Sequence, residues 1–223
     1  MLLKLNHERR ATLIIGFAGA KRSGKDSAAK ILQTEFGSQK EIYKHSFAHK
    51  LKESAAACLD IPTDEEFTPE MWSDTMKENG VIDITWGDYE NGVGPRGFKR
   101  ITGREYLQKY GTEAHRNIFG HDFWIDAVLD KIPDNSEYEQ EIGYYSRLDL
   151  ITDVRFSNEA EAILDRDGMV VQIRRSSVES DNPEHASEVP LRDALVSQVI
   201  MNDKDLETYR TNLLSFFINE VML

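Results

Sequence analysis

Apolar residues fall into short continuous runs that alternate with longer stretches of helical spacing. The run at residues 11–18 is rich in β-branched residues and is typical of a strand buried in the middle of a parallel sheet. From Lys25 to about Phe36, apolar residues recur at three- and four-residue intervals, which predicts a helix. A strand, a glycine-containing turn and a helix are therefore expected to follow one another here.

The alternation continues through the rest of the chain. Further strands are predicted at about 42–47, 147–153, 169–173 and 199–201. Further helices are predicted at about 49–59, 102–117, 123–131, 157–167 and 206–221, with a short helical stretch after Pro190. Strands that alternate with helices predict an α/β fold, in which helices cover both faces of a parallel sheet.

Two segments interrupt this alternation. Residues 60–100 carry prolines, glycines and many acidic residues, so we interpret them as an insertion of loops with a short hairpin near Val81 to Trp86. Residues 174–190 are polar and are expected to form a loop. At the end of the insertion, Thr102 and Glu105 have the spacing of a capping box, which predicts the start of a helix.

Composition limits the classes of function. The 223 residues suit a single α/β domain, 1–223, with insertions. The formal charge of −12 disfavours broad attraction to nucleic acid polymers or anionic lipids, so a phosphate site must be built from a few clustered groups. Cys58 is the only cysteine, and the six histidines lack the H-E-x-x-H spacing, so neither a disulfide nor a zinc enzyme is expected.

Nothing in the sequence predicts a membrane segment. No apolar run approaches the roughly 20 residues that span a bilayer. The first ten residues are charged and lack the apolar core of a signal peptide. We therefore expect a cytoplasmic protein.

The clearest motif lies at residues 19–27, Gly-Ala-Lys-Arg-Ser-Gly-Lys-Asp-Ser, between the first predicted strand and helix. It matches the G-x-x-x-x-G-K part of the Walker A pattern, in which glycines let backbone amides face phosphate oxygens at a helix N-terminus. Lys25 supplies a positive charge for the β- and γ-phosphates. The predicted ATP-binding residues are Gly19, Lys21, Arg22, Ser23, Gly24, Lys25, Asp26 and Ser27.

The motif departs from its pattern at one position. A Ser or Thr that helps to hold Mg²⁺ normally follows the lysine, whereas here Asp26 follows it and the hydroxyl comes at Ser27. A carboxylate is a good ligand for Mg²⁺, so we predict Asp26 and Ser27 as metal ligands. Asp26 could instead orient or deprotonate the acceptor, and the sequence leaves both roles open.

The loop resembles the variant loop of the bacteriophage deoxynucleoside monophosphate kinases, which carry Lys-Arg-Ser-Gly-Lys-Asp before Ser or Thr. Several other stretches are similar to the same family. They are Ser46-Phe47-Ala48 with Leu51-Lys52, residues 103–113, Phe123-Trp124, residues 152–159 (Thr-Asp-Val-Arg-Phe-Ser-Asn-Glu) and residues 185–188 (His-Ala-Ser-Glu). The resemblance covers about residues 12–205, with 60–100 unplaced.

This resemblance implies a three-layer P-loop kinase fold with an acceptor-binding insertion at about 47–120 and a lid at about 174–190. It implies transfer of the γ-phosphoryl group of ATP, with Mg²⁺, to a deoxynucleoside monophosphate. Lys25 and Asp26 would then be catalytic.

The acceptor side is predicted from a helix and a strand end. Arg104 and Gln108 are four residues apart and share a helix face, and an arginine fork suits a phosphate monoester. The resemblance makes Arg104 an acceptor ligand; a solvated helix charge is the alternative. Thr112 follows a glycine that either kinks this helix or lets a ligand approach.

Asp153 ends a predicted strand, where parallel sheets place their ligands. It is predicted to bind the metal or the acceptor. Arg155 is predicted to bind the acceptor phosphate and to be catalytic. The alternative is a structural ion pair between the two.

The predicted lid begins with two arginines. Kinases use such arginines to neutralise the transferring group, and we assign this catalytic role to one of them, Arg174, beside Arg175. Glu188 falls in the lid motif and is predicted to bind substrate. Phe47 and Trp124 could stack on a base, although aromatic residues at such spacings are more often core.

Three functions stay open at this level. The first is a deoxynucleoside monophosphate kinase. The second is a kinase of the phosphomevalonate or dephospho-coenzyme A type on the same scaffold, and the third is a non-kinase ATP-binding switch. The apolar helix after Leu206 would suit either a homodimer face or the core.

Overall fold

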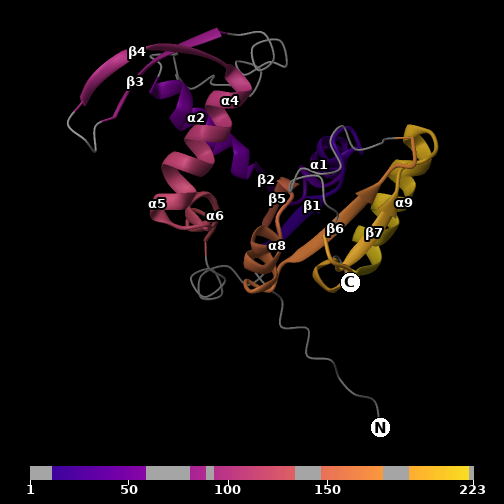
Figure 1. Ribbon diagram of the computed structural model, residues 1–223. Helices are drawn as coiled ribbons and strands as arrows, with labels where there is room; N and C mark the ends of the chain where they lie inside the picture. Colours follow the sequence, from indigo (N-terminus) through magenta and orange to yellow (C-terminus); the bar gives the residue numbers. More distant parts are fainter. Residues whose placement is uncertain (1–11, 59–80, 89–92, 134–146, 178–190, 221–223) are drawn as a thin grey trace. The chain divides into compact units, whose positions relative to one another are not determined.

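The computed structural model describes residues 12–58, 81–88, 93–133, 147–177 and 191–220 (Figure 1). The elements in chain order are β1 (Thr12–Ala18), α1 (Lys25–Phe36), β2 (Glu41–His45), α2 (Phe47–Ala57), β3 (Val81–Asp88), β4 (Val93–Thr102), α4 (Gly103–Gln108), η3 (Lys109–Arg116), α5 (Asn117–Phe119), α6 (Phe123–Leu129), β5 (Arg147–Val154), α8 (Ser157–Leu164), β6 (Met169–Arg174), η5 (Asp193–Leu195), β7 (Gln198–Met201) and α9 (Leu206–Glu220).

These elements divide into two compact units. One unit comprises residues up to Phe47 together with those from Ile125 onward, and the other is Ala48–Trp124. The second unit has nearly the bounds predicted for the insertion, about 47–120. Its role in binding an acceptor stays a prediction.

The first unit is built on a five-stranded sheet of order β2-β5-β1-β6-β7. All four neighbouring pairs are parallel. The predicted α/β fold with a parallel sheet is thus confirmed. β1 is central and buried along almost its whole length, which explains its continuous apolar sequence.

Helices α1 and α9 cover one face of this sheet. Ala28, Leu32 and Phe36 of α1 and Leu213 and Phe217 of α9 pack against the strands in one apolar cluster. The apolar side of α9 that the sequence offered as a dimer face is therefore used, at these positions, in the core of the unit.

Helices α6 and α8 contribute to the apolar cluster of the other face. Ile125 and Leu129 of α6 and Ile163 of α8 join Ile151 and Val170 of the sheet in this cluster. With helices on both faces, the carboxyl ends of the parallel strands are the edge at which ligands bind in such sheets.

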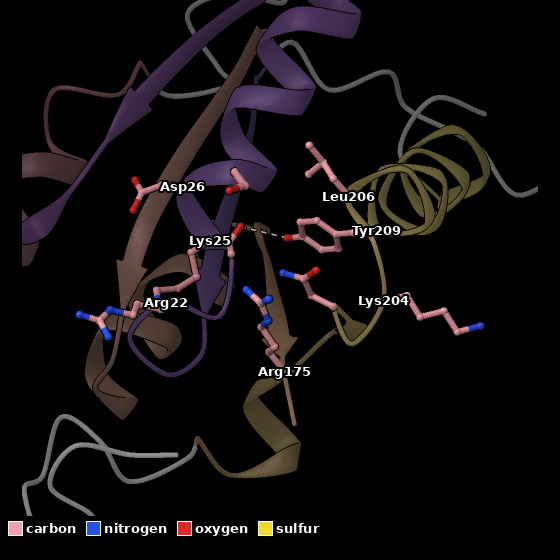
Figure 2. A pocket seen from close by; sticks show the side chains of 10 residues that line it. Arg22, Lys25, Asp26, Arg175, Lys204, Leu206 and Tyr209 are labelled. Atoms are coloured by element: carbon pink, nitrogen blue, oxygen red, sulfur yellow. Dashed lines mark hydrogen bonds between the residues drawn. The ribbon is translucent and has the colours of Figure 1, made fainter. Parts of the chain in front are cut away.

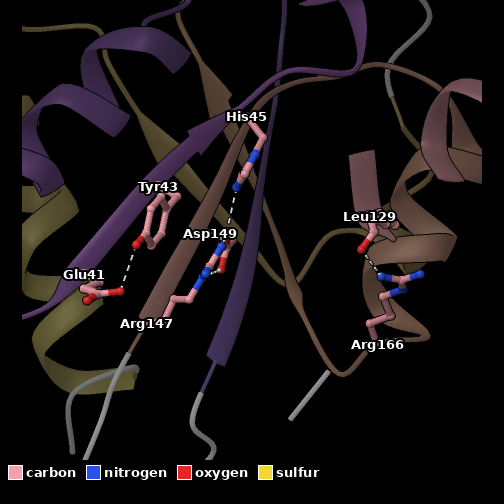
Figure 3. A network of polar contacts seen from close by, with 7 residues as sticks. All are labelled: Glu41, Tyr43, His45, Leu129, Arg147, Asp149 and Arg166. Carbon is pink, nitrogen blue, oxygen red and sulfur yellow. Dashed lines mark hydrogen bonds and ion pairs between the residues drawn. The ribbon is translucent and has the colours of Figure 1, made fainter. Parts of the chain in front are cut away.

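A buried carboxylate ties the edge strand β2 to β5 (Figure 3). Asp149 is fully buried; it accepts hydrogen bonds from Arg147 at 2.7 and 2.8 Å and pairs with His45 Nε2 at 2.7 Å. Burial alone would raise the pKa of Asp149, but these hydrogen bonds and charges outweigh it and hold the pKa below its usual value. The Arg147 guanidinium also lies 4.0 Å from the centre of the Tyr43 ring.

The second unit contains the antiparallel hairpin β3–β4, α2 and the helical segment from Gly103 to Phe119. The hairpin confirms the prediction near Val81 to Trp86 and extends it. Ala55, Ala56, Ile101 and Leu107 form its apolar cluster.

Some predicted boundaries are wrong. The strand predicted to reach residue 47 ends at His45, because Ser46 Oγ and Phe47 N both donate to Asp153 and Phe47 begins α2. The helical stretch after Pro190 is only a short 3₁₀ turn, η5. The middle of the helix predicted at 102–117 is the π-helix η3, in which side chains of His115 and Trp124 bind the carbonyls of Tyr110 and Gly111.

Candidate active site

The loop between β1 and α1 has an unusual backbone. Gly19, Arg22 and Gly24 all have positive φ, at 139°, 63° and 112°. A Cβ on Gly19 would lie 2.3 Å from the carbonyl oxygen of Ile173, and one on Gly24 would lie 2.5 Å from Nδ2 of Asn202. The two glycines of the motif are thus required by conformation and by space.

Lys25 folds back over this loop. Its Nζ donates to the carbonyl oxygens of Gly19 and Ala20, each at 2.7 Å. The side chain is largely buried, so its charge is concentrated at the N-terminus of α1. A helix N-terminus with an adjacent lysine is well suited to hold an anion.

A pocket of about 290 Å³ opens beside the loop (Figure 2). Its lining residues are Arg22, Gly24, Lys25, Asp26, Ser27, Arg175, Asn202, Lys204, Leu206 and Tyr209. Four of these side chains are cationic and one is a carboxylate, so the pocket is locally positive in a chain of net charge −12. This local concentration of charge suits a polyphosphate.

Most of the predicted nucleotide residues line this pocket, with three exceptions. Gly19 contributes its carbonyl to Lys25 instead. Lys21 is exposed, and Ser23 is only 1% exposed, so that its side chain packs beneath the loop.

Of the two arginines at the end of β6, Arg175 rather than Arg174 lies at the pocket. Arg174 donates to Gln172 at 3.0 and 3.2 Å and lies 3.7 Å from Asp193. Side chains two apart on a strand share a face, which brings Arg174 to Gln172 and turns Arg175 to the other side. The catalytic role of Arg174 stays a prediction, and Arg175 is a second candidate because it lines the pocket.

Asp26 is paired with a residue that the sequence analysis did not select. Lys44 Nζ, on β2, lies 2.7 Å from Asp26 Oδ1. The Asp26 side chain is 76% exposed and that of Lys44 is 42% exposed, so solvent and ions reach both groups.

The oxygens of Asp26 and Ser27 suit a magnesium ion that is shared with phosphates. Mg²⁺ typically takes one or two protein ligands and completes its shell with water and phosphate oxygens. Within the described parts of the chain, no group of three or more His, Cys, Asp or Glu side chains could hold a metal alone. A metal here would therefore depend on a bound nucleotide.

Asp153 holds the start of α2. Its Oδ2 accepts from Ser46 Oγ at 2.8 Å and its Oδ1 from Phe47 N at 2.9 Å. The strand-end position was predicted correctly, but both oxygens already have partners within the chain. Its role as a metal or acceptor ligand stays a prediction.

Arg155 is exposed just after β5. Its backbone N–H donates to the buried Glu159 at 2.7 Å, and Phe156 N donates to the same oxygen at 3.0 Å. Glu159 thereby caps the N-terminus of α8 and fixes the backbone of Arg155.

The two aromatic candidates are core residues. Phe47 is 3% exposed within the apolar cluster of α6 and α8. Trp124 is 4% exposed, and its Nε1 donates to Gly111 O at 3.1 Å. Stacking of either ring on a base is not supported, because packing already covers both.

The remaining acceptor candidates lie in the second unit or outside the described residues. Arg104 and Gln108 are both exposed on α4 with helical i, i+4 spacing, and Thr112 is exposed on η3. Glu188 lies outside the described residues, as does most of the predicted lid.

Sequence reasoning missed Lys44, Asn202, Lys204, Leu206 and Tyr209. Asn202 directly follows a short apolar strand, so the rule that ligands meet strand ends could have selected it. Tyr209 carried no such signal, because an aromatic residue in an apolar helix predicts only core.

Two comparisons with known proteins agree. A family profile described as "Deoxynucleotide monophosphate kinase" matches residues 97–213, just over half of the chain. A protein of Acanthamoeba polyphaga mimivirus named "Putative deoxynucleotide monophosphate kinase" is 30% identical over 210 residues, which cover 91% of this chain and 95% of that protein. In the described residues, no helix is long and apolar enough to cross a membrane.

Proposed function

Since this chain belongs to the deoxynucleotide monophosphate kinase family and phosphorylates deoxynucleoside monophosphates, we propose that the loop at residues 19–27 binds the phosphates of its donor, ATP. The observation that carries this proposal is the cationic pocket beside the N-terminus of α1. Family membership also decides between the acceptor classes that the sequence left open.

Lys25, Arg22 and Arg175 are the cations that would face the donor phosphates in this pocket. Lys25 Nζ already donates to two loop carbonyls. Phosphate oxygens would replace these two acceptors with little movement of the side chain. Arg175 would neutralise charge on the transferring group, as arginines do in phosphoryl transfer.

Asp26 and Ser27 would hold Mg²⁺ together with phosphate oxygens. The ion supplies charge neutralisation across the β- and γ-phosphates when it is bound. Asp26 must then leave Lys44, which releases a lysine at the same edge of the pocket.

Each of the two units offers its own candidate ligands for the acceptor phosphate, outside the loop. Arg104 and Gln108 on α4 share one exposed helix face, and Arg155 is exposed at a strand end. An arginine fork can meet two oxygens of a phosphate monoester at once. Alignment of donor and acceptor with charge neutralisation would provide the catalysis, with little covalent chemistry from the protein.

The experiment is a coupled assay of ADP release with ATP, Mg²⁺ and each of the four dNMPs and the matching ribonucleotides. Stimulation by at least one dNMP is expected. ADP release that no monophosphate stimulates would contradict the assignment of this activity.

Lys25→Ala tests the donor loop in the same assay. We expect a loss of turnover by about 10³-fold or more, because the charge on the β- and γ-phosphates is removed. Arg192→Met is the control, since it removes a cation from an exposed ion pair with Glu161 in the same unit. Turnover retained by Lys25→Ala would exclude the loop as the donor site.

A further inference from the structure

Two buried side chains from the segment around β7 and α9 hold consecutive carbonyls of the phosphate loop. Asn202 Nδ2 donates to Ser23 O at 2.8 Å. Tyr209 Oη donates to Gly24 O at 3.0 Å (Figure 2). Asn202 is 9% exposed and Tyr209 is 1% exposed. Hydrogen bonds so shielded from water hold their partners more firmly than surface bonds do.

These bonds determine where two loop amides point. In a trans peptide, the carbonyl and the N–H of the same unit point in opposite directions. A fixed Ser23 carbonyl therefore fixes the N–H of Gly24, and a fixed Gly24 carbonyl fixes the N–H of Lys25. The Gly24 carbonyl also accepts the first hydrogen bond of α1, from Ala28 N at 2.9 Å, and Tyr209 is its second donor. Both N–H groups face away from Asn202 and Tyr209 at the N-terminus of α1, where helix geometry leaves amides available to an anion.

The same contacts also reduce repulsion in the loop. Asn202 and Tyr209 occupy the carbonyls of Ser23 and Gly24, and they would still do so when Lys25 turns from the carbonyls of Gly19 and Ala20 to the phosphates. A carbonyl dipole that is satisfied by a donor presents less negative charge to a phosphate. Donors thus hold the carbonyls and leave the amides for the ligand.

The supporting residues are themselves held in place. The backbone N–H of Asn202 donates to Arg174 O at 2.7 Å, and Asp203 Oδ1 accepts from Ser176 N at 2.5 Å. Burial raises the pKa of Tyr209, so its phenol stays protonated and remains a donor. A Cβ at Gly24 would collide with the Asn202 amide, which shows how closely the loop and its support fit.

We propose that Asn202 and Tyr209 are positioning residues of the donor site, which set the Gly24 and Lys25 amides for the phosphates of ATP. The inference rests on the proposed donor role of the loop. It assigns a positioning role to two residues far from the motif in sequence. Asn202 lies 179 residues after Ser23, and Tyr209 lies 185 residues after Gly24.

Tyr209→Phe tests this proposal, because it removes one hydroxyl and leaves the packed ring. The dissociation constant of ATP is measured by calorimetry, and the KM values of ATP and of the dNMP are measured by the coupled assay. We expect ATP to bind about 5-fold more weakly, as for the loss of one buried hydrogen bond, with the KM of the dNMP within 2-fold of wild type. Asn202→Asp places a carboxylate oxygen, which can only accept, against the Ser23 carbonyl. This variant is expected to weaken ATP binding more strongly than Tyr209→Phe does.

Tyr43→Phe is the matched control, since it removes a phenol hydrogen bond of 2.9 Å to Glu41 elsewhere in the same unit. It should change none of the three values, the dissociation constant of ATP and the KM values of ATP and of the dNMP. A Tyr209→Phe protein that melts earlier but binds ATP as wild type does, or one in which both KM values rise equally, overturns the proposal. Lys25→Ala is measured in parallel: if it also binds and uses ATP normally, the donor assignment itself has failed.

Discussion

The phosphate loop of this kinase replaces the usual metal-binding hydroxyl by Asp26, and that carboxylate has a cationic partner. Lys44 Nζ lies 2.7 Å from Asp26 Oδ1, beside the pocket that we propose binds the phosphates of ATP. An exposed pair of this kind contributes about 0–1 kcal/mol, so an ion can exchange with the lysine. Lys44 and a magnesium ion are therefore expected to compete for Asp26.

Lys44→Met should lower the Mg²⁺ concentration at half-maximal turnover by about 2- to 3-fold, because Asp26 loses a competing cation. Asp26→Asn should raise that concentration, because a charged ligand is lost. Both values come from Mg²⁺ titrations of the coupled assay at saturating ATP. An unchanged midpoint in both variants would mean that Asp26 does not bind the metal.

Asp149 illustrates a residue whose charge supports the fold rather than the site. Its pKa is held below the ordinary value of 3.8, so its ionised form stabilises the native state above that pH, and the contribution is lost as the pH falls below it. Asp149→Asn should lower the free energy of unfolding at pH 7 by about 3 kcal/mol, since the partly buried Arg147 loses its fully buried counter-charge.

Urea unfolding of both proteins between pH 7 and pH 3 checks this prediction. The difference between wild type and variant should stay constant down to about pH 4 and shrink at lower pH, where the wild-type carboxylate takes up a proton. A difference that grows as the pH falls would contradict it.

At the scale of elements, the start of α4 is stabilised by a reciprocal capping box. Thr102 Oγ1 accepts from Glu105 N at 3.2 Å, and Glu105 Oε2 accepts from Thr102 N at 2.9 Å. Thr102→Ala should destabilise the helix by about 1 kcal/mol and speed amide exchange in its first turn. Thr34→Ala, at an exposed position within α1, is the control and should have no such effect.

Elements that depend on neighbouring residues were predictable from the sequence. β1, the glycine loop and α1 follow from local apolar spacing, and the capping box follows from two residues three apart. The end of β2 was not predictable, because a carboxylate more than a hundred residues away starts α2. The π-helix was also missed; the side chains of His115 and Trp124 bind carbonyls within it, and local apolar spacing does not reveal such contacts.

The same division between local and distant contacts explains why only part of the candidate site was predicted. The residues of the loop are contiguous, so a pattern could identify them. Arg175, Lys44 and Tyr209 join them only because parallel crossovers bring β6, β2 and α9 to one edge of the sheet. Strand order is decided by packing over long sequence separations and is not visible in local spacing.

At the scale of the whole molecule, the donor loop and Arg155 lie in one compact unit, whereas Arg104 and Gln108 lie in the other. Hydrogen exchange should therefore show that ATP and the dNMP protect different segments of the chain. A non-hydrolysable ATP analogue should slow exchange at residues 19–27 and near Asn202, whereas a dNMP should slow exchange in α4 around Arg104. Protection of α4 by the ATP analogue alone would contradict this division.

The support of the phosphate loop by Asn202 and Tyr209 has a consequence for how the enzyme is made. A ribosome completes the loop first and adds these two residues 179 and 185 positions later, a delay of roughly 10–40 s at ordinary rates of translation. Throughout that interval the nascent chain contains every residue of its nucleotide motif, yet lacks the donors that set its amides. A chain released early would carry the motif with a weaker affinity, so unfinished copies of the enzyme would compete less well for the ATP of the cell.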